Sequence, residues 1–155
     1  MSVFLSSFEN KIDKKGRVSV PAPFRQALSQ ESFQGVVLFR SYKSNTLEGC
    51  GLSRMIRLSE SVDAMDQFSQ EHDDLAATIF ADAHQLAFDT DGRILLPKPL
   101  LDHANISEKA MFVGRGGTFQ IWDPNDFHQH QEKARERAQE KGMTLKLNPS
   151  RGDHA

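Results

Sequence analysis

Two stretches of this chain repeat one pattern, and this duplication constrains the fold more than any other feature. Residues 12–23 read IDKKGRVSVPAP and residues 88–99 read FDTDGRILLPKP, so the second copy follows the first at an offset of 76 residues. The matched positions are Asp13 and Asp89, Gly16 and Gly92, Arg17 and Arg93, Pro21 and Pro97, and Pro23 and Pro99. A match at fixed spacing indicates a duplicated structural unit.

Each copy predicts a tight hairpin turn that leads into a short strand. Gly16 and Gly92 tolerate the positive φ that such a turn requires, and an aspartate that opens the turn can accept hydrogen bonds from the amides after it. The alternation over residues 18–20 places two valines on one face, and Pro21 ends the strand because it cannot donate to a ladder. Pro23 is suited to the first turn of a following helix.

Composition restricts the class of protein. The 155 residues allow one compact domain or two small units that share a core, and the net charge of −2 gives no general basic coat. The single Cys50 excludes an intramolecular disulfide and a multi-cysteine zinc site. No apolar run approaches a membrane span, and no charged segment followed by an apolar one opens the chain. We therefore expect a cytoplasmic protein.

The remaining elements follow from local patterns. Residues 1–10 should be extended with Phe4 and Phe8 facing inward, and a short helix should end near Ser29. Further along, the patterns predict a buried strand over 36–39, a second strand that includes Leu47 and Leu52, helices over 55–65 and 75–80, strands over 110–113 and 118–122 around a glycine hairpin, a polar helix from Pro124 toward Lys141 with Gly142 as its stop, and a disordered tail over 143–155.

A concentration of cations marks the first hairpin. Residues 11–25 contain one acid, Asp13, and five basic residues: Lys11, Lys14, Lys15, Arg17 and Arg25. Arginine can donate two hydrogen bonds to guanine, lysines can neutralise phosphates, and a two-stranded ribbon fits the major groove. The structural alternative is that Arg17 pairs with Asp13 and braces the turn.

The middle of the chain has the opposite charge. From residue 58 to residue 92 there is no lysine or arginine, and the acids are Glu60, Asp63, Asp66, Glu71, Asp73, Asp74, Asp82, Asp89 and Asp91. This pattern is typical of a solvated helix surface, and it is also compatible with an acidic site for a partner.

Other constellations do not support a catalytic or metal site. His128 and His130 are two residues apart, so on a helix they point to different faces. Arg151-Gly152-Asp153 is a chance tripeptide in the tail. No nucleophile lies beside an evident base, so the sequence predicts neither an enzyme nor a cofactor.

The two repeated turns, Asp13-x-x-Gly16-Arg17 and Asp89-x-x-Gly92-Arg93, resemble those of the MraZ family of bacterial regulators. The segment Phe119-Gln120-Ile121-Trp122-Asp123-Pro124 after a glycine hairpin is part of the same resemblance. The resemblance covers nearly the whole chain and implies an α+β fold: a double swapped-hairpin β-barrel of the AbrB type, built from two tandem repeats as an intrachain pseudo-dimer, with short helices and a C-terminal helix. The expected units are repeats at 7–54 and 83–126, a helical connector at 55–82, a helix at 127–142 and a tail at 143–155. Residues 40–53 depart from the family pattern, which more often has an aromatic-proline pair there.

The resemblance also implies sequence-specific binding to double-stranded DNA, at repeated promoter boxes upstream of a division and cell-wall gene cluster. It further implies a ring-like homo-oligomer associated with the nucleoid, with Arg17 and Arg93 facing DNA. The alternative function is a protein–protein interaction or assembly module, antitoxin-like, whose contact face is the acidic middle. Salt dependence separates the two, because binding through several cations weakens steeply with added salt.

Overall fold

The computed structural model describes residues 3–149. It divides into a unit that ends at Pro124 and a second unit that begins at Asn125. The first unit holds all of the strands described below and most of the helices. The second unit consists of helix α5 from its second residue, Asn125, onward and of the residues after that helix.

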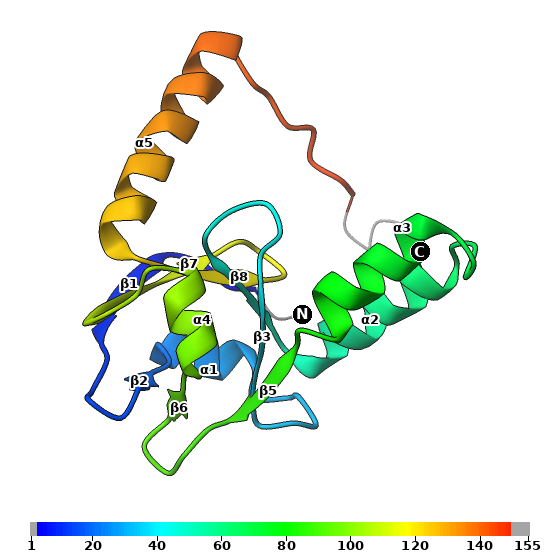
Figure 1. The fold of residues 1–155 in the computed structure, drawn as a ribbon. Coiled ribbons are helices and arrows are strands. Elements are labelled where there is room, and N and C mark those ends of the chain that lie inside the picture. Colours follow the sequence, from blue (N-terminus) through cyan, green and yellow to red (C-terminus); the bar gives the residue numbers. More distant parts are fainter. Residues whose placement is uncertain (1–2, 150–155) are drawn as a thin grey trace. The chain divides into compact units, whose positions relative to one another are not determined.

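The elements of the first unit come in two matching series (Figure 1). The first series is β1 (Ser7–Lys11), β2 (Arg17–Ser19), α1 (Ala22–Ala27), β3 (Gly35–Arg40) and β4 (Leu47–Cys50). Three helical segments follow: α2 (Leu52–Asp63), α3 (Gln70–Leu75) and the π-helix η1 (Ala76–Phe80). The second series is β5 (His84–Ala87), β6 (Arg93–Leu95), α4 (Lys98–His103), β7 (Lys109–Gly114) and β8 (Phe119–Trp122). α5 spans Pro124–Lys141.

Strands of the two series pair mainly with each other. The larger sheet has the order β1-β7-β8-β4-β3-β5, and a separate two-stranded ribbon joins β2 to β6. Every pair is antiparallel, and β1 with β7, β4 with β8, β3 with β5 and β2 with β6 each join one series to the other. The fold is thus α+β with antiparallel sheets, and neither repeat supplies its own complete set of strand partners.

The main core is built from aromatic and aliphatic side chains of both series. Phe24 is fully buried, and its ring centroid lies 5.2 Å from that of Phe4 and 5.3 Å from that of Phe119. Gly49 of β4 leaves room for this cluster, because a Cβ there would lie 2.4 Å from the Phe119 ring. Residues of the first series, Phe24 and Gly49, therefore depend for their packing on Phe119 of the second series.

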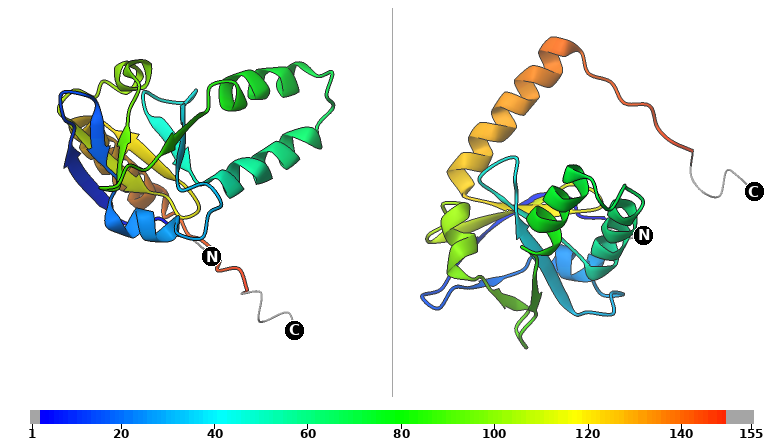
Figure 2. Two further views of the ribbon diagram at one scale, coloured as in Figure 1. Left: turned by 90° about the horizontal axis from the view of Figure 1, so that it is seen from below. Right: turned by 45° about the vertical axis from the view of Figure 1, so that its right-hand side comes forward.

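A second, smaller core lies between the helical segment and the large sheet. It contains Val37, Phe39, Cys50, Met55 and Ile79. Burial raises the pKa of the Cys50 thiol to about 12, so this cysteine stays protonated and acts as an apolar core residue. Figure 2 shows α2 and α3 running alongside each other and extending away from the strands.

Most of the elements predicted from local patterns are confirmed. Phe4 is buried and Phe8 packs against the core. Helix α4 begins and ends 76 residues after α1, which is the offset between the two sequence repeats, and each helix has a proline in its first turn. α5 ends at Lys141, and Gly142 follows it with a φ of 57°. Residues 143–149 form no helix or strand, and the tripeptide at 151–153 lies outside the described residues.

The prediction that Leu52 belongs to a strand is wrong, because Leu52 begins α2. The amide and hydroxyl of Ser53 donate to the carboxylate of Glu31 at 2.8 Å and 2.6 Å. A carboxylate from 22 positions earlier therefore satisfies one of the free amides at the start of this helix, and the preceding strand ends at Cys50. Within residues 3–149 no helix has the length and apolar character that crossing a membrane requires.

Candidate nucleic-acid interface

The first repeated turn is held by the side chain of Asp13. One carboxylate oxygen of Asp13 accepts hydrogen bonds from the amides of Lys15 at 3.0 Å and Arg17 at 2.8 Å. The other accepts from Nε of Arg17 at 2.7 Å. The amide of Gly16 donates to the Asp13 carbonyl at 3.0 Å, and Gly16 has a φ of 89°. The turn therefore requires both the aspartate and the glycine.

The second turn repeats this geometry bond for bond. Asp89 accepts from the amides of Asp91 at 2.8 Å and Arg93 at 2.9 Å, and from Nε of Arg93 at 2.9 Å. Gly92 donates to the Asp89 carbonyl at 3.1 Å and has a φ of 74°. The shared sequence pattern thus encodes a shared turn.

Both aspartates are held in the ionised form. The backbone hydrogen bond from Arg17 is the largest influence on Asp13 and keeps its pKa below the ordinary value of 3.8, although burial opposes it. The backbone hydrogen bond from Arg93 lowers the pKa of Asp89 in the same way. Each arginine therefore braces its own turn, as the structural alternative for Arg17 anticipated. Bracing also fixes the direction of the guanidinium group before any ligand arrives.

The ribbon formed by β2 and β6 turns both arginines to one face. Val18 pairs with Ile94, and each is 1% exposed, so these two side chains point into the core. Alternation along a strand then places Arg17, Ser19, Arg93 and Leu95 on the opposite, outward face. Arg17 lies opposite Leu95 and diagonal to Arg93, a relation that spans roughly 7–8 Å. We call these four residues the outward ribbon face.

The predicted lysines lie around the first turn. Lys14 and Lys15 are exposed at its tip, and Lys11 is the exposed last residue of β1. Arg17 is the fourth cation at this end of the ribbon, with about one third of its side chain exposed. The structure thus brings together four of the six predicted DNA-binding residues.

The grouping of Arg25 with the first hairpin is wrong, because this residue lies against the second turn. A Cβ at Gly92 would lie 2.8 Å from the Arg25 guanidinium group. The reason is the antiparallel ribbon: the amide of Val20 donates to the carbonyl of Gly92 at 3.1 Å, and Nε of Arg25 donates to the carbonyl of Val20 at 3.1 Å. Residues that follow β2 therefore meet the turn that precedes β6.

The two ends of the ribbon differ in charge. The first turn has Lys14 and Lys15 at its tip, whereas the second has Thr90 and Asp91. The Asp91 carboxylate lies 3.3 Å from Nη2 of Arg93 and competes for that guanidinium group. The guanidinium group of Arg25 adds one positive charge beside the second turn. The first turn remains the more basic end.

Sequence reasoning missed Leu95. It is 55% exposed on the outward ribbon face, where the first repeat has Ser19. The signal was present, since Leu95 is two residues after Arg93 in a strand and must share its face.

The acidic segment is partly paired within the protein. Asp82 accepts a hydrogen bond from the amide of Arg40 at 2.8 Å and binds its guanidinium group. Burial raises the pKa of Asp82, but the bonds from Arg40 outweigh burial and leave that pKa lowered. In the described part of the chain, no group of three or more His, Cys, Asp or Glu residues is placed to hold a metal ion.

Comparison with known proteins agrees with the duplicated pattern. A profile of the MraZ protein family, described as antitoxin-like, matches residues 3–49 and 79–147. The chain belongs to the MraZ family. The transcriptional regulators MraZ of Rickettsia akari (strain Hartford) and Rickettsia canadensis (strain McKiel) are each 44% identical to it over 146 residues, covering 94% of this chain and 98% of theirs. MraZ of Rickettsia bellii (strain OSU 85-389) is 43% identical over 147 residues.

Membership of the MraZ family indicates the general role of this chain. The relatives are named as transcriptional regulators, and the matches extend over nearly their whole length, so a role in regulating transcription follows for this chain. The resemblance inferred from the two turns is thereby confirmed. The residue assignments on the ribbon remain predictions.

Proposed function

We propose that this protein regulates transcription by binding double-stranded DNA in a sequence-specific manner through the outward ribbon face. The observation that carries this proposal is the placement of Arg17 and Arg93, from separate repeats, on one face of a two-stranded ribbon. A ribbon of this kind fits the major groove, where an arginine can donate two bonds to guanine O6 and N7. Lys11, Lys14 and Lys15 contribute phosphate contacts, and Arg25 contributes one at the second turn.

In this proposal the two repeats form an intrachain pseudo-dimer of the swapped-hairpin, AbrB-like barrel type. The strand pairing supports this view. Strands β1 and β5 are equivalent in the two repeats, as are β7 and β3, so the β1–β7 pair corresponds to the β5–β3 pair. The two central pairs, β2 with β6 and β4 with β8, each join equivalent strands. Such a pseudo-two-fold arrangement presents two similar turns to two successive stretches of DNA.

Affinity in this proposal comes from several copies acting together. Each phosphate contact adds only about 0.9 to the salt slope on duplex DNA, so one turn with a few cations binds weakly. A ring-like homo-oligomer places many ribbon faces at fixed spacing, and repeated promoter boxes then engage several of them at once. The expected targets are boxes upstream of a division and cell-wall gene cluster, with the protein on the nucleoid.

The test is a titration of labelled DNA from upstream of the protein's own gene at 50 mM and 200 mM salt. The proposal predicts a steep loss of affinity with salt, and far weaker binding to a probe with one box than to a probe with several. Salt-independent binding would contradict the electrostatic contacts. Equal affinity for one box and several would contradict the multivalent mechanism.

A second candidate function is an antitoxin-like interaction module. The family description and the acidic segment between residues 58 and 92 favour it. In that case the exposed acids of α2 and α3 would bind a basic protein partner, and substitution of Arg17 would not weaken the complex. The DNA titration separates the two functions.

A further inference from the structure

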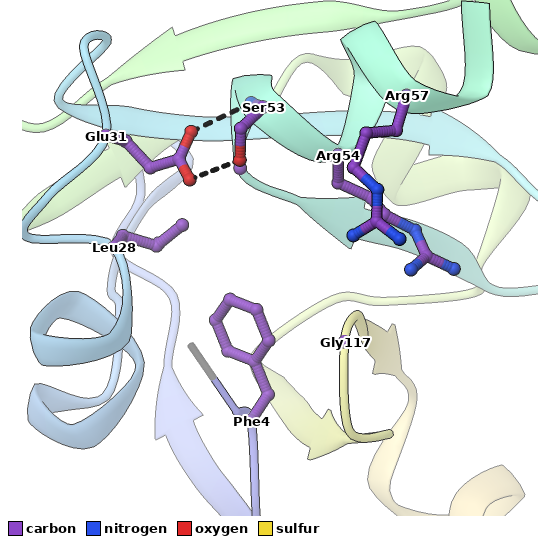
Figure 3. A pocket seen from close by; sticks show the side chains of 8 residues that line it. Phe4, Leu28, Glu31, Ser53, Arg54, Arg57 and Gly117 are labelled. Carbon is purple, nitrogen blue, oxygen red and sulfur yellow. Dashed lines mark hydrogen bonds between the residues drawn. The ribbon is translucent and has the colours of Figure 1, made fainter. Parts of the chain in front are cut away.

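A pocket of about 390 Å³ lies away from the ribbon, at the start of α2. Phe4 and Leu28 supply apolar lining, Glu31 lies on one side, and Arg54 and Arg57 come from α2 on the other. Figure 3 shows both guanidinium groups reaching from α2 into the space above Phe4 and Gly117. None of the pocket residues belongs to the outward ribbon face, so the pocket is separate from the proposed DNA surface.

The two arginines lack anionic partners. Of the residues that the structure describes, no carboxylate comes within ion-pair distance of either guanidinium group; the ion pairs are those of Arg17, Arg40, Arg93, Lys98 and Lys109. Glu31 is the acid among the residues that line the pocket, and its two oxygens accept hydrogen bonds from the amide and hydroxyl of Ser53. The pocket therefore holds two cations whose charge the protein does not balance.

The environment of Arg54 makes this imbalance costly. Its Nε is buried and has no hydrogen-bond partner among the described residues. Arg57 lies three residues later on the same helix, so the two like charges share one face. Both are near the N-terminus of a 12-residue helix whose first turn contains no acid, and the helix dipole is unfavourable to cations there. A buried donor without a partner and two adjacent cations are features that a bound anion would relieve.

From this geometry we propose that the pocket binds a small molecule through an oxyanion group, a carboxylate or a phosphate. The planar fork of each guanidinium matches the oxygens of such a group. The apolar side chains of Phe4 and Leu28 favour an oxyanion on a compact apolar body over a bare ion. The volume suits a small molecule, and the site would give a regulator of this kind a place to bind an effector.

Calorimetric titration with phenyl phosphate and with inorganic phosphate tests the proposal. We expect phenyl phosphate to bind more tightly than inorganic phosphate, and Arg54→Gln or Arg57→Gln to weaken it at least about tenfold. Lys98→Gln removes the same charge from an exposed site and should change the affinity less than about twofold. Arg57 is exposed, so its substitution tests the site even if Arg54→Gln unfolds.

Three results would overturn the proposal. The first is unchanged binding of phenyl phosphate in both arginine variants. The second is loss of oligomer mass in sedimentation when Arg54 or Arg57 is substituted, which would assign the pocket to an acidic side chain of a second copy. The third is a smaller salt slope for DNA binding in these variants, which would assign the arginines to DNA phosphates.

Discussion

Gly16→Val should destabilise the protein because two features of the structure oppose a side chain there. Gly16 has a φ of 89°, where a β-branched residue is strained, and its Cβ would lie 3.1 Å from the main-chain oxygen of Leu96. That oxygen cannot move freely, since the amide of Leu96 donates to the Gly16 carbonyl at 2.9 Å. Together these effects cost about 2 kcal/mol of unfolding free energy, which lowers the melting temperature by about 4–8 °C in a chain of this size.

Arg17→Ala provides the matched comparison at the next residue. It removes the bond from Nε to Asp13, but the carboxylate keeps the amides of residues 15 and 17. The melting temperature, followed by circular dichroism at equal protein concentration, should fall by less than about 2 °C. A fall as large as that of Gly16→Val would show that Arg17 is chiefly a structural brace, and the reasoning about the outward ribbon face would be refuted.

Three further predictions concern stability. Residues 1–76 alone should show no cooperative unfolding by calorimetry, because all four of their strands lose partners from the second repeat; a dispersed NMR spectrum with a sharp melting transition would contradict this. Gly49→Ala should cost about 1–3 kcal/mol in urea unfolding, because its Cβ would enter the Phe119 ring, and an unchanged midpoint would refute that packing. Asp13 and Asp89 have pKa values below 3.8, so the stability that they supply is full above pH of about 4 and is lost as the pH falls below it. The double substitution to asparagine should therefore make the unfolding free energy, measured by fluorescence, depend less on pH in the acid range.

The local elements of the fold could be predicted because their causes are local. Asp13 and Gly16 determine the first turn within five residues, and the same pair at residues 89 and 92 determines the second. The helices α1 and α4 follow their prolines at the same offset. Membership of the MraZ family followed from these repeats.

What local patterns could not predict depends on distant parts of the chain. The local pattern assigned Leu52 to a strand, but the distant carboxylate of Glu31 accepts hydrogen bonds from Ser53 in the first turn of α2. Arg25 is close to the first hairpin in sequence, but antiparallel pairing with β6 places it against Gly92. The lack of a partner for Nε of Arg54 could not be predicted either, because the sequence does not show which acids lie near it.

The central claim is that the outward ribbon face binds DNA, and the affinity of single-arginine variants for a multi-box promoter probe tests it most directly. Arg17→Ala should abolish measurable specific binding, and Arg93→Ala should weaken it less, because Asp91 already engages Arg93. Arg115→Ala removes an equal charge from the exposed β7–β8 turn and should leave the affinity within about twofold of the parent protein. Full binding by the Arg17→Ala and Arg93→Ala proteins, or an equal loss in Arg115→Ala, would contradict the claim.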